Sequence, residues 1–119
     1  MKFKEFITFL GTNDLKITSN FYQNILGLNV YKDQKICVIF HINKCGKIGF
    51  CEHIPVIHDD KSPIITLVTK EVDELYTKLI NKGLIIAESP KLNKKFNIYH
   101  FFFKDPNGYT IEIQRFLKE

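Results

Sequence analysis

The chain has 119 residues, of which 45% are hydrophobic, including eleven Phe and no Trp. A chain of this length and apolar content is expected to fold rather than to remain disordered. Its formal net charge of +4 comes from lysines scattered along the sequence. Proteins that bind nucleic acids typically concentrate basic residues on one face. Because the lysines here are scattered, we expect no nucleic-acid partner.

The sequence also indicates a compartment. No segment has the length and apolar content of a membrane helix, and charged residues interrupt the first ten positions. The three cysteines, Cys37, Cys45 and Cys51, match no zinc-ribbon or redox spacing. An odd number of cysteines without such spacing is more typical of a protein in a reducing compartment than of a disulfide framework. We therefore expect a cytoplasmic protein without a membrane partner.

The first half of the chain predicts the element order βαβββ. Residues 7–15 have the pattern of a strand that runs into the start of a helix. Apolar residues at helical spacing over 14–26 predict that helix, and Gly27 is placed to end it. The remaining strands of this half are predicted at residues 28–31, 36–42 and 47–53.

The second half repeats this order. Residues 64–72 share Ile, Leu, Thr, an acid and an aliphatic residue with 7–15 at equal spacings. Helical spacing continues over 71–80, and Gly83 is placed to end the helix. The remaining strands of this half are predicted at residues 84–87, 98–104 and 109–116.

Two similar halves predict an α+β fold in which two βαβββ modules form a curved mixed sheet around a cleft. We place the modules at residues 1–54 and 64–119, joined by a short polar stretch over 55–63. Neither half alone would bury enough surface to be stable, so both belong to one domain, 1–119. The alternative is a ferredoxin-like or other α+β sandwich with an accidental likeness between its halves.

Turn chemistry predicts which side chains face the cleft. The sequence Asp-Pro-Asn-Gly at 105–108 predicts a three-residue loop with a bulge, which pairs Phe102 with Glu112 and His100 with Gln114. An equivalent loop over residues 43–46 would pair Cys37 with His53, Ile39 with Cys51 and His41 with Gly49. Alternation along the strands then gives an inner face made of Ile7, Phe9, His41, Gly49, Cys51, His53, Ile64, Thr66, His100, Phe102, Thr110, Glu112 and Gln114.

Three segments together resemble the vicinal oxygen chelate superfamily, which includes glyoxalase I, bleomycin resistance proteins and extradiol dioxygenases. They are residues 12–28, 72–83 and 104–113, and the resemblance extends over essentially the whole chain. It implies a small-molecule ligand in the cleft between the modules. It also implies a homodimer, because family members commonly complete their clefts with a second copy.

The resemblance further implies four metal-ligand positions in the metal-dependent members, and these map to Ile7, Gly49, Ile64 and Glu112. Only Glu112 has a side-chain donor, and a divalent ion held by one carboxylate would gain too little to lose its water. We therefore expect a metal-independent protein that binds an apolar or aromatic ligand in the cleft. The predicted ligand-binding residues are Ile7, Phe9, His41, Gly49, Cys51, Ile64, Thr66, His100, Phe102 and Glu112.

Other functions remain open on the sequence. A lyase, isomerase or dioxygenase would hold Zn²⁺, Ni²⁺, Mn²⁺ or Fe²⁺ at a non-standard site formed by Glu112 with His41, His53 or His100. Glu112 is then the candidate catalytic residue, whereas its structural alternative is a carboxylate held by neighbouring donors. Cys51 is either a thiolate nucleophile beside His53 or a small buried filler. A non-catalytic scaffold would use neither.

Overall fold

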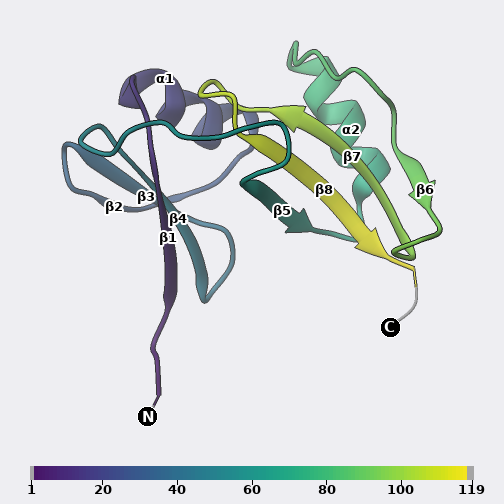
Figure 1. Ribbon diagram of the computed structural model, residues 1–119, viewed down its shortest axis with the longest axis horizontal. Coiled ribbons are helices and arrows are strands. Elements are labelled where there is room, and N and C mark those ends of the chain that lie inside the picture. Colours follow the sequence, from purple (N-terminus) through teal and green to yellow (C-terminus); the bar gives the residue numbers. More distant parts are fainter. Residues whose placement is uncertain (1, 118–119) are drawn as a thin grey trace. The chain divides into compact units, whose positions relative to one another are not determined.

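The structure is a computed structural model that describes residues 2–117. The chain divides between Ile57 and His58 into two compact units, here called module 1 and module 2, and this division lies within the predicted joint at 55–63. Each module has the βαβββ order and a four-stranded mixed sheet (Figure 1), so the predicted α+β fold class is confirmed. No helix in the described residues is long and apolar enough to span a membrane.

Module 1 has the strand order β1-β4-β3-β2, with β1 parallel to β4 and the other pairs antiparallel. The predicted helix over 14–26 is found as an α-helix followed by a π-helical segment, in which Leu26 N donates to Phe21 O. Asp14 caps it by accepting a hydrogen bond from Ile17 N at 3.0 Å. The elements are β1 (Phe6–Gly11), α1 (Leu15–Asn20), η1 (Phe21–Ile25), β2 (Val30–Asp33), β3 (Cys37–His41) and β4 (Gly46–Cys51).

Module 2 has the equivalent order β5-β8-β7-β6. The prediction of a strand at 84–87 is wrong. Leu84 N donates to Leu79 O at the end of the helix, and Ile85 is 92% exposed, so this segment closes the helix instead of pairing. The elements are β5 (Ile64–Val68), α2 (Val72–Asn81), β6 (Lys91–Asn93), β7 (Ile98–Lys104) and β8 (Thr110–Phe116).

Each sheet buries one face under its own helical segment. In module 1, Tyr22 stacks on Phe50 with ring centroids 4.5 Å apart. In module 2, Ile111 and Ile113 of β8 are fully buried, and α2 packs against β7 and β8 (Figure 1). Burial of each such side chain stabilises the fold by roughly 1.5–3 kcal/mol. The opposite face of β8 therefore carries Glu112, as its alternation predicts.

The predicted register is right in one hairpin and wrong in the other. Phe102 pairs with Glu112 and His100 with Gln114, as the turn at 105–108 predicts. In the first hairpin, the observed Cα partners are Cys37 with Cys51, Ile39 with Gly49 and His41 with Lys47. The register differs from the prediction by two residues, so every side chain keeps its predicted face.

The longer loop of the first hairpin has a local cause. The Asn43 side chain accepts hydrogen bonds from Cys45 N at 3.1 Å and Gly46 N at 2.6 Å. Ile42 N and Asn43 N both donate to Gly46 O, so the loop closes around its own asparagine. This loop therefore pairs His41 with Lys47, and not with Gly49 as the sequence predicted.

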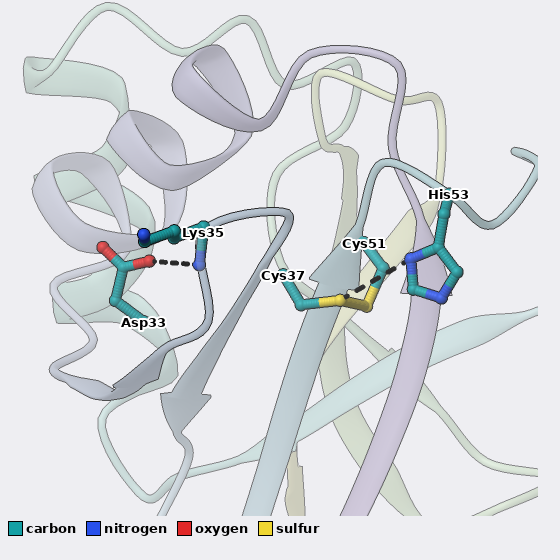
Figure 2. Close-up of a disulfide and its surroundings, with 5 residues drawn as sticks. All are labelled: Asp33, Lys35, Cys37, Cys51 and His53. Carbon is teal, nitrogen blue, oxygen red and sulfur yellow. Dashed lines mark hydrogen bonds between the residues drawn. A yellow bond between two sulfur atoms is a disulfide. The ribbon is translucent and has the colours of Figure 1, made fainter.

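This register places two cysteines directly opposite each other. Cys37 and Cys51 form a disulfide (Figure 2), whereas Cys45 is free and exposed. The expectation of free thiols without a disulfide is therefore wrong for Cys37 and Cys51. Cys51 is also no thiolate nucleophile in this form. It is 1% exposed, which agrees with the alternative of a buried filler.

The hydroxyl of Tyr31 forms a hydrogen bond with the carboxyl group of Glu5 and lowers its pKa. Tyr31 Oη donates to Glu5 Oε2 at 3.0 Å, and Lys47 Nζ lies 3.4 Å from Glu5 Oε1. The Tyr31 hydrogen bond lowers the pKa of Glu5 most, with a smaller lowering from Lys47. The lowered pKa of Glu5 contributes stability at pH values above the pKa that Glu5 has in the unfolded chain. This contribution is lost as the pH falls through the pKa of Glu5 in the folded protein.

We expect Tyr31→Phe to raise the pKa of Glu5 toward its ordinary value, because the replacement removes the strongest hydrogen bond to the carboxylate. A carbon-detected NMR titration of the Glu5 carboxyl group measures this pKa directly. Tyr99→Phe is the matched control, since the Tyr99 hydroxyl donates to Asp73 instead. An unchanged Glu5 pKa in Tyr31→Phe would contradict the assignment.

Candidate functional site

A cluster of hydrogen-bonded polar side chains in module 2 surrounds Glu112, which lies on β8 and is 8% exposed. Thr66 of β5 donates to Glu112 Oε1 at 2.8 Å, and Gln114 Nε2 donates to the same oxygen at 3.0 Å. His100 Nδ1 lies 2.7 Å from Oε2, and because a carboxylate accepts, the imidazole N–H donates. Both oxygens of Glu112 are therefore engaged by neighbouring side chains.

Strand pairing explains why these groups meet. Thr66 is the direct Cα partner of Glu112 across the parallel β5–β8 pair. His100 pairs with Gln114 across β7–β8, so its ring lies diagonally beside Glu112 on the same face. Three neighbouring strands thus contribute one hydrogen-bond network. Such a network is held by the sheet itself and needs no loop to order it.

One polar atom of this cluster remains without a partner among the described residues. Gln114 Oε1 is buried and accepts no hydrogen bond. A buried acceptor without a donor costs about 1–3 kcal/mol. Because Gln114 also lines the hollow described next, its oxygen is the candidate acceptor for a hydrogen bond from a ligand.

The cluster opens into a hollow of about 450 Å³ on module 2. Phe102, 40% exposed, meets the His100 ring edge-to-face with centroids 5.0 Å apart. A mostly apolar wall with a few convergent polar groups is typical of a small-molecule site. The hollow is lined by Ile64, Asn93, Phe96, Ile98, His100, Phe102, Glu112, Gln114 and Phe116.

Several lining residues were not among the predicted site residues. Asn93 ends β6, and Phe96 lies in the segment between β6 and β7. Residues 91–97 show no strand periodicity, so only the lone aromatic Phe96 could have indicated a contribution from this segment. Gln114 lay on the predicted inner face but not in the predicted ligand set. Ile98 and Phe116 lie outside both predicted lists.

The predicted site residues of module 1 form a separate set. Phe9 is the Cα partner of Gly49, and its ring lies over that glycine. A Cβ added at Gly49 would lie 2.6 Å from Phe9 Cε1, so the ring fills the space that a side chain would need. Ile7 is half-buried on β1. His41 contacts the Tyr31 ring, with centroids 4.8 Å apart.

These positions do not fit the superfamily's metal site. Ile7 and Ile64 have no donor atoms, and at Gly49 the ring of Phe9 excludes a carboxylate unless it moves. Glu112 is already bound by three side chains. Within residues 2–117, no group of three adjacent metal-ligating side chains includes Glu112. The residues at these four positions therefore do not fit a metal ion.

The residues proposed from the sequence for a non-standard metal site do not fit a metal ion either. His100 is hydrogen-bonded to Glu112, so the two groups satisfy each other rather than converge on an ion. His41 and His53 belong to module 1, where His41 contacts Tyr31 and His53 lies beside Cys37. Each of the three histidines thus has a local contact within its own module.

Known structures share this architecture. A glyoxalase/bleomycin resistance protein/dioxygenase from Nocardioides is 17% identical, with 99% of this chain and 85% of that one covered at a TM-score of 0.78. Lactoylglutathione lyase from Agrobacterium tumefaciens is 19% identical, with coverages of 92% and 90% and a TM-score of 0.73. An integron cassette protein from the mobile metagenome of a Halifax Harbour sewage outfall is 19% identical, with coverages of 93% and 97% and a TM-score of 0.78. At these identities the likeness shows the fold alone. No curated protein sequence matches the chain.

Two βαβββ modules in one chain define the glyoxalase-like fold. The model of the Glyoxalase/Bleomycin resistance protein/Dioxygenase superfamily matches residues 6–113, and the chain belongs to this superfamily.

Proposed function

We propose that the protein binds a small apolar or aromatic molecule without a metal ion, in the hollow of module 2. The sequence predicted that residues on this strand face bind the ligand. The observation that carries the proposal is the state of Glu112, whose two oxygens accept from three side chains inside an apolar hollow. A carboxylate so engaged serves as a fixed anchor for the polar wall, not as a free metal ligand.

The walls of the hollow favour a flat ligand with one hydrogen-bond donor. The exposed faces of Phe102 and Phe96 offer stacking surfaces. Gln114 Oε1, which is buried and unpartnered, would accept from a ligand O–H or N–H group. An aromatic alcohol or lactam combines both features, so this is the ligand class that we propose.

The alternative of a divalent-metal lyase, isomerase or dioxygenase has less support. It would require Glu112 to give up hydrogen bonds from Thr66 and Gln114, or from His100, before one oxygen could bind an ion. Leaving these donors unpaired in a buried cluster costs about 1–3 kcal/mol each.

A second hollow, in module 1, is lined only by exposed residues, namely Phe3, Lys4, Glu5, Phe6 and Cys45.

From the family resemblance we also propose a homodimer. In other members of the superfamily, a second copy commonly completes the ligand site. Size-exclusion chromatography with light scattering measures the mass in solution. A mass of one chain at the concentrations used for ligand binding would contradict the dimer.

Binding of 2-naphthol, compared with naphthalene, tests the proposed ligand class. We expect 2-naphthol to bind about tenfold more tightly, because its hydroxyl satisfies the Gln114 acceptor and such a bond is worth about 1–1.5 kcal/mol. Backbone NMR titration gives both dissociation constants and locates the binding residues. Equal affinities, or shifts confined to module 1, would contradict the proposal.

Phe102→Ala should weaken 2-naphthol binding about tenfold, since it removes a stacking surface worth about 0.5–1.5 kcal/mol together with its buried area. Phe3→Ala is the matched control, because it removes the same side chain from an 86% exposed position in module 1. The same titration measures both variants. Equal losses in the two variants would place the ligand elsewhere.

A further inference from the structure

A second cluster of reactive side chains lies at one edge of module 1's sheet. The Sγ atoms of Cys37 and Cys51 and a ring nitrogen of His53 all lie within 4.8 Å of one another. The two cysteines form a disulfide, and His53 Nδ1 lies 3.9 Å from Cys37 Sγ. Figure 2 shows the imidazole turned toward the sulfur pair. The cluster shares no residue with the hollow of module 2.

Backbone pairing holds the cysteines in place independently of the disulfide. Cys37 begins β3 and its carbonyl accepts from Gln34 N at 2.8 Å. Cys51 ends β4 and its carbonyl accepts from Thr12 N at 3.0 Å. The two residues are also Cα partners across the β3–β4 pair. Reduction therefore leaves two thiols side by side on a fixed strand pair.

The reduced cluster has the donor atoms of a soft-metal site. Two thiolates and one imidazole provide three of the four ligands that Zn²⁺ takes, with bonds of about 2.3 Å to sulfur and about 2.0 Å to nitrogen. Cys37 and Cys51 are 6% and 1% exposed, so paired thiolates there need a nearby cation. His53 is exposed, which gives an ion and a fourth, solvent ligand access to the cluster.

We propose that reduction of the Cys37–Cys51 disulfide creates a Cys₂His site, completed by His53, that binds one soft divalent cation such as Zn²⁺. Binding releases the two thiol protons. The site uses none of the four positions that correspond to the superfamily's metal ligands. It is therefore distinct from the standard metal site, and it is independent of the ligand proposed for module 2.

Oxidation reverses this binding. When hydrogen peroxide oxidises the loaded site, the two thiolates lose two electrons and form the S–S bond. Peroxide takes up these electrons with two protons and leaves as two waters, and the cation departs hydrated. A trialkylphosphine with water restores the two thiols and becomes the phosphine oxide. The cluster thus alternates between a disulfide and a metal-bound dithiolate.

The test is a Co²⁺ titration of phosphine-reduced protein, in which thiolate-to-cobalt charge transfer gives a near-ultraviolet absorption band. We expect one Co²⁺ per chain in the reduced protein and no such band in the oxidised protein. His53→Ala, a change at an exposed residue, should weaken binding by at least about tenfold, since even loss of an outer-shell partner has an effect of that size. Cys45→Ser removes the free cysteine and should leave the titration unchanged.

Zn²⁺ release provides a second measurement. Zinc-loaded protein treated with hydrogen peroxide should deliver its metal to a chromogenic chelator, and mass spectrometry should show the loss of two hydrogens. The proposal is overturned if reduced protein binds no Co²⁺, or if the folded protein resists reduction. It is also overturned if the oxidised protein binds Co²⁺ equally well, or if Cys45→Ser abolishes the band while His53→Ala retains it.

Discussion

Glu112→Ala is expected to lower the free energy of unfolding by about 2–4 kcal/mol, because three donors in a buried cluster would lose their acceptor. Thr66, His100 and Gln114 all donate to this one carboxylate, at 2.7–3.0 Å. The hollow beside the cluster admits water, which keeps the loss below the sum of three isolated hydrogen bonds. Urea denaturation of the purified variant measures the difference.

Glu112→Gln is the matched control for this prediction. Its carbonyl oxygen can accept from Thr66, and its amide can donate to a His100 ring nitrogen after a change of tautomer. We therefore expect it to lower the free energy of unfolding by only about 1 kcal/mol. If Glu112→Ala proves as stable as the unmodified chain, the hydrogen bonds to Glu112 do not stabilise the fold. The structural role assigned to this carboxylate is then wrong.

Gly11→Ala is expected to destabilise the fold by about 3 kcal/mol, because the added methyl group would overlap main-chain atoms that cannot rotate away. Gly11 ends β1, and its missing Cβ would meet the backbone carbonyl oxygens of Ile54 and Pro55. Accommodating the methyl group would push the segment after β4 away from the end of β1. Thermal unfolding followed by circular dichroism detects the loss.

Gly46→Ala provides the comparison. There the nearest atom to an added Cβ is Asn43 Oδ1 at 3.0 Å, which belongs to a side chain that can rotate. We expect a loss of about 1 kcal/mol, roughly one hydrogen bond from the Asn43 loop. Equal losses at the two glycines would show that the carbonyl contacts at Gly11 do not limit its side chain.

The second hairpin illustrates what the sequence could predict. The turn at 105–108 contains a proline and a glycine at positions that select one loop type, and the register of β7 and β8 follows from it. That register correctly placed His100, Phe102 and Glu112 on one face. Turn chemistry and strand alternation are local properties, so one sequence is enough to show them.

The first hairpin shows where such reasoning fails. Asn43 accepts from two backbone amides of its own loop, which lengthens the loop and changes the register by two residues. The predicted register separated Cys37 from Cys51, so the disulfide was missed together with its His53 neighbour. Asparagine occurs in loops of several lengths, and the sequence alone does not distinguish between them.

The site was predicted in part for a similar reason. Residues on regular strands, such as Glu112 and Thr66, follow from alternation once the turn is known. Asn93 and Phe96 reach the hollow from β6 and the segment after it, where no periodic pattern exists. The unpartnered oxygen of Gln114 depends on the side-chain geometry of three strands, which no spacing in the sequence encodes.

Module 2 is proposed to bind an aromatic ligand without a metal. The most direct measurement is the dissociation constant of 2-naphthol for the disulfide-bonded protein, taken in excess EDTA and again with added Zn²⁺, Ni²⁺, Mn²⁺ or Fe²⁺. Use of the oxidised form keeps the Cys37–Cys51–His53 cluster from contributing. We predict the same dissociation constant under all conditions. Binding that appears only with metal and disappears in Glu112→Gln would contradict the claim.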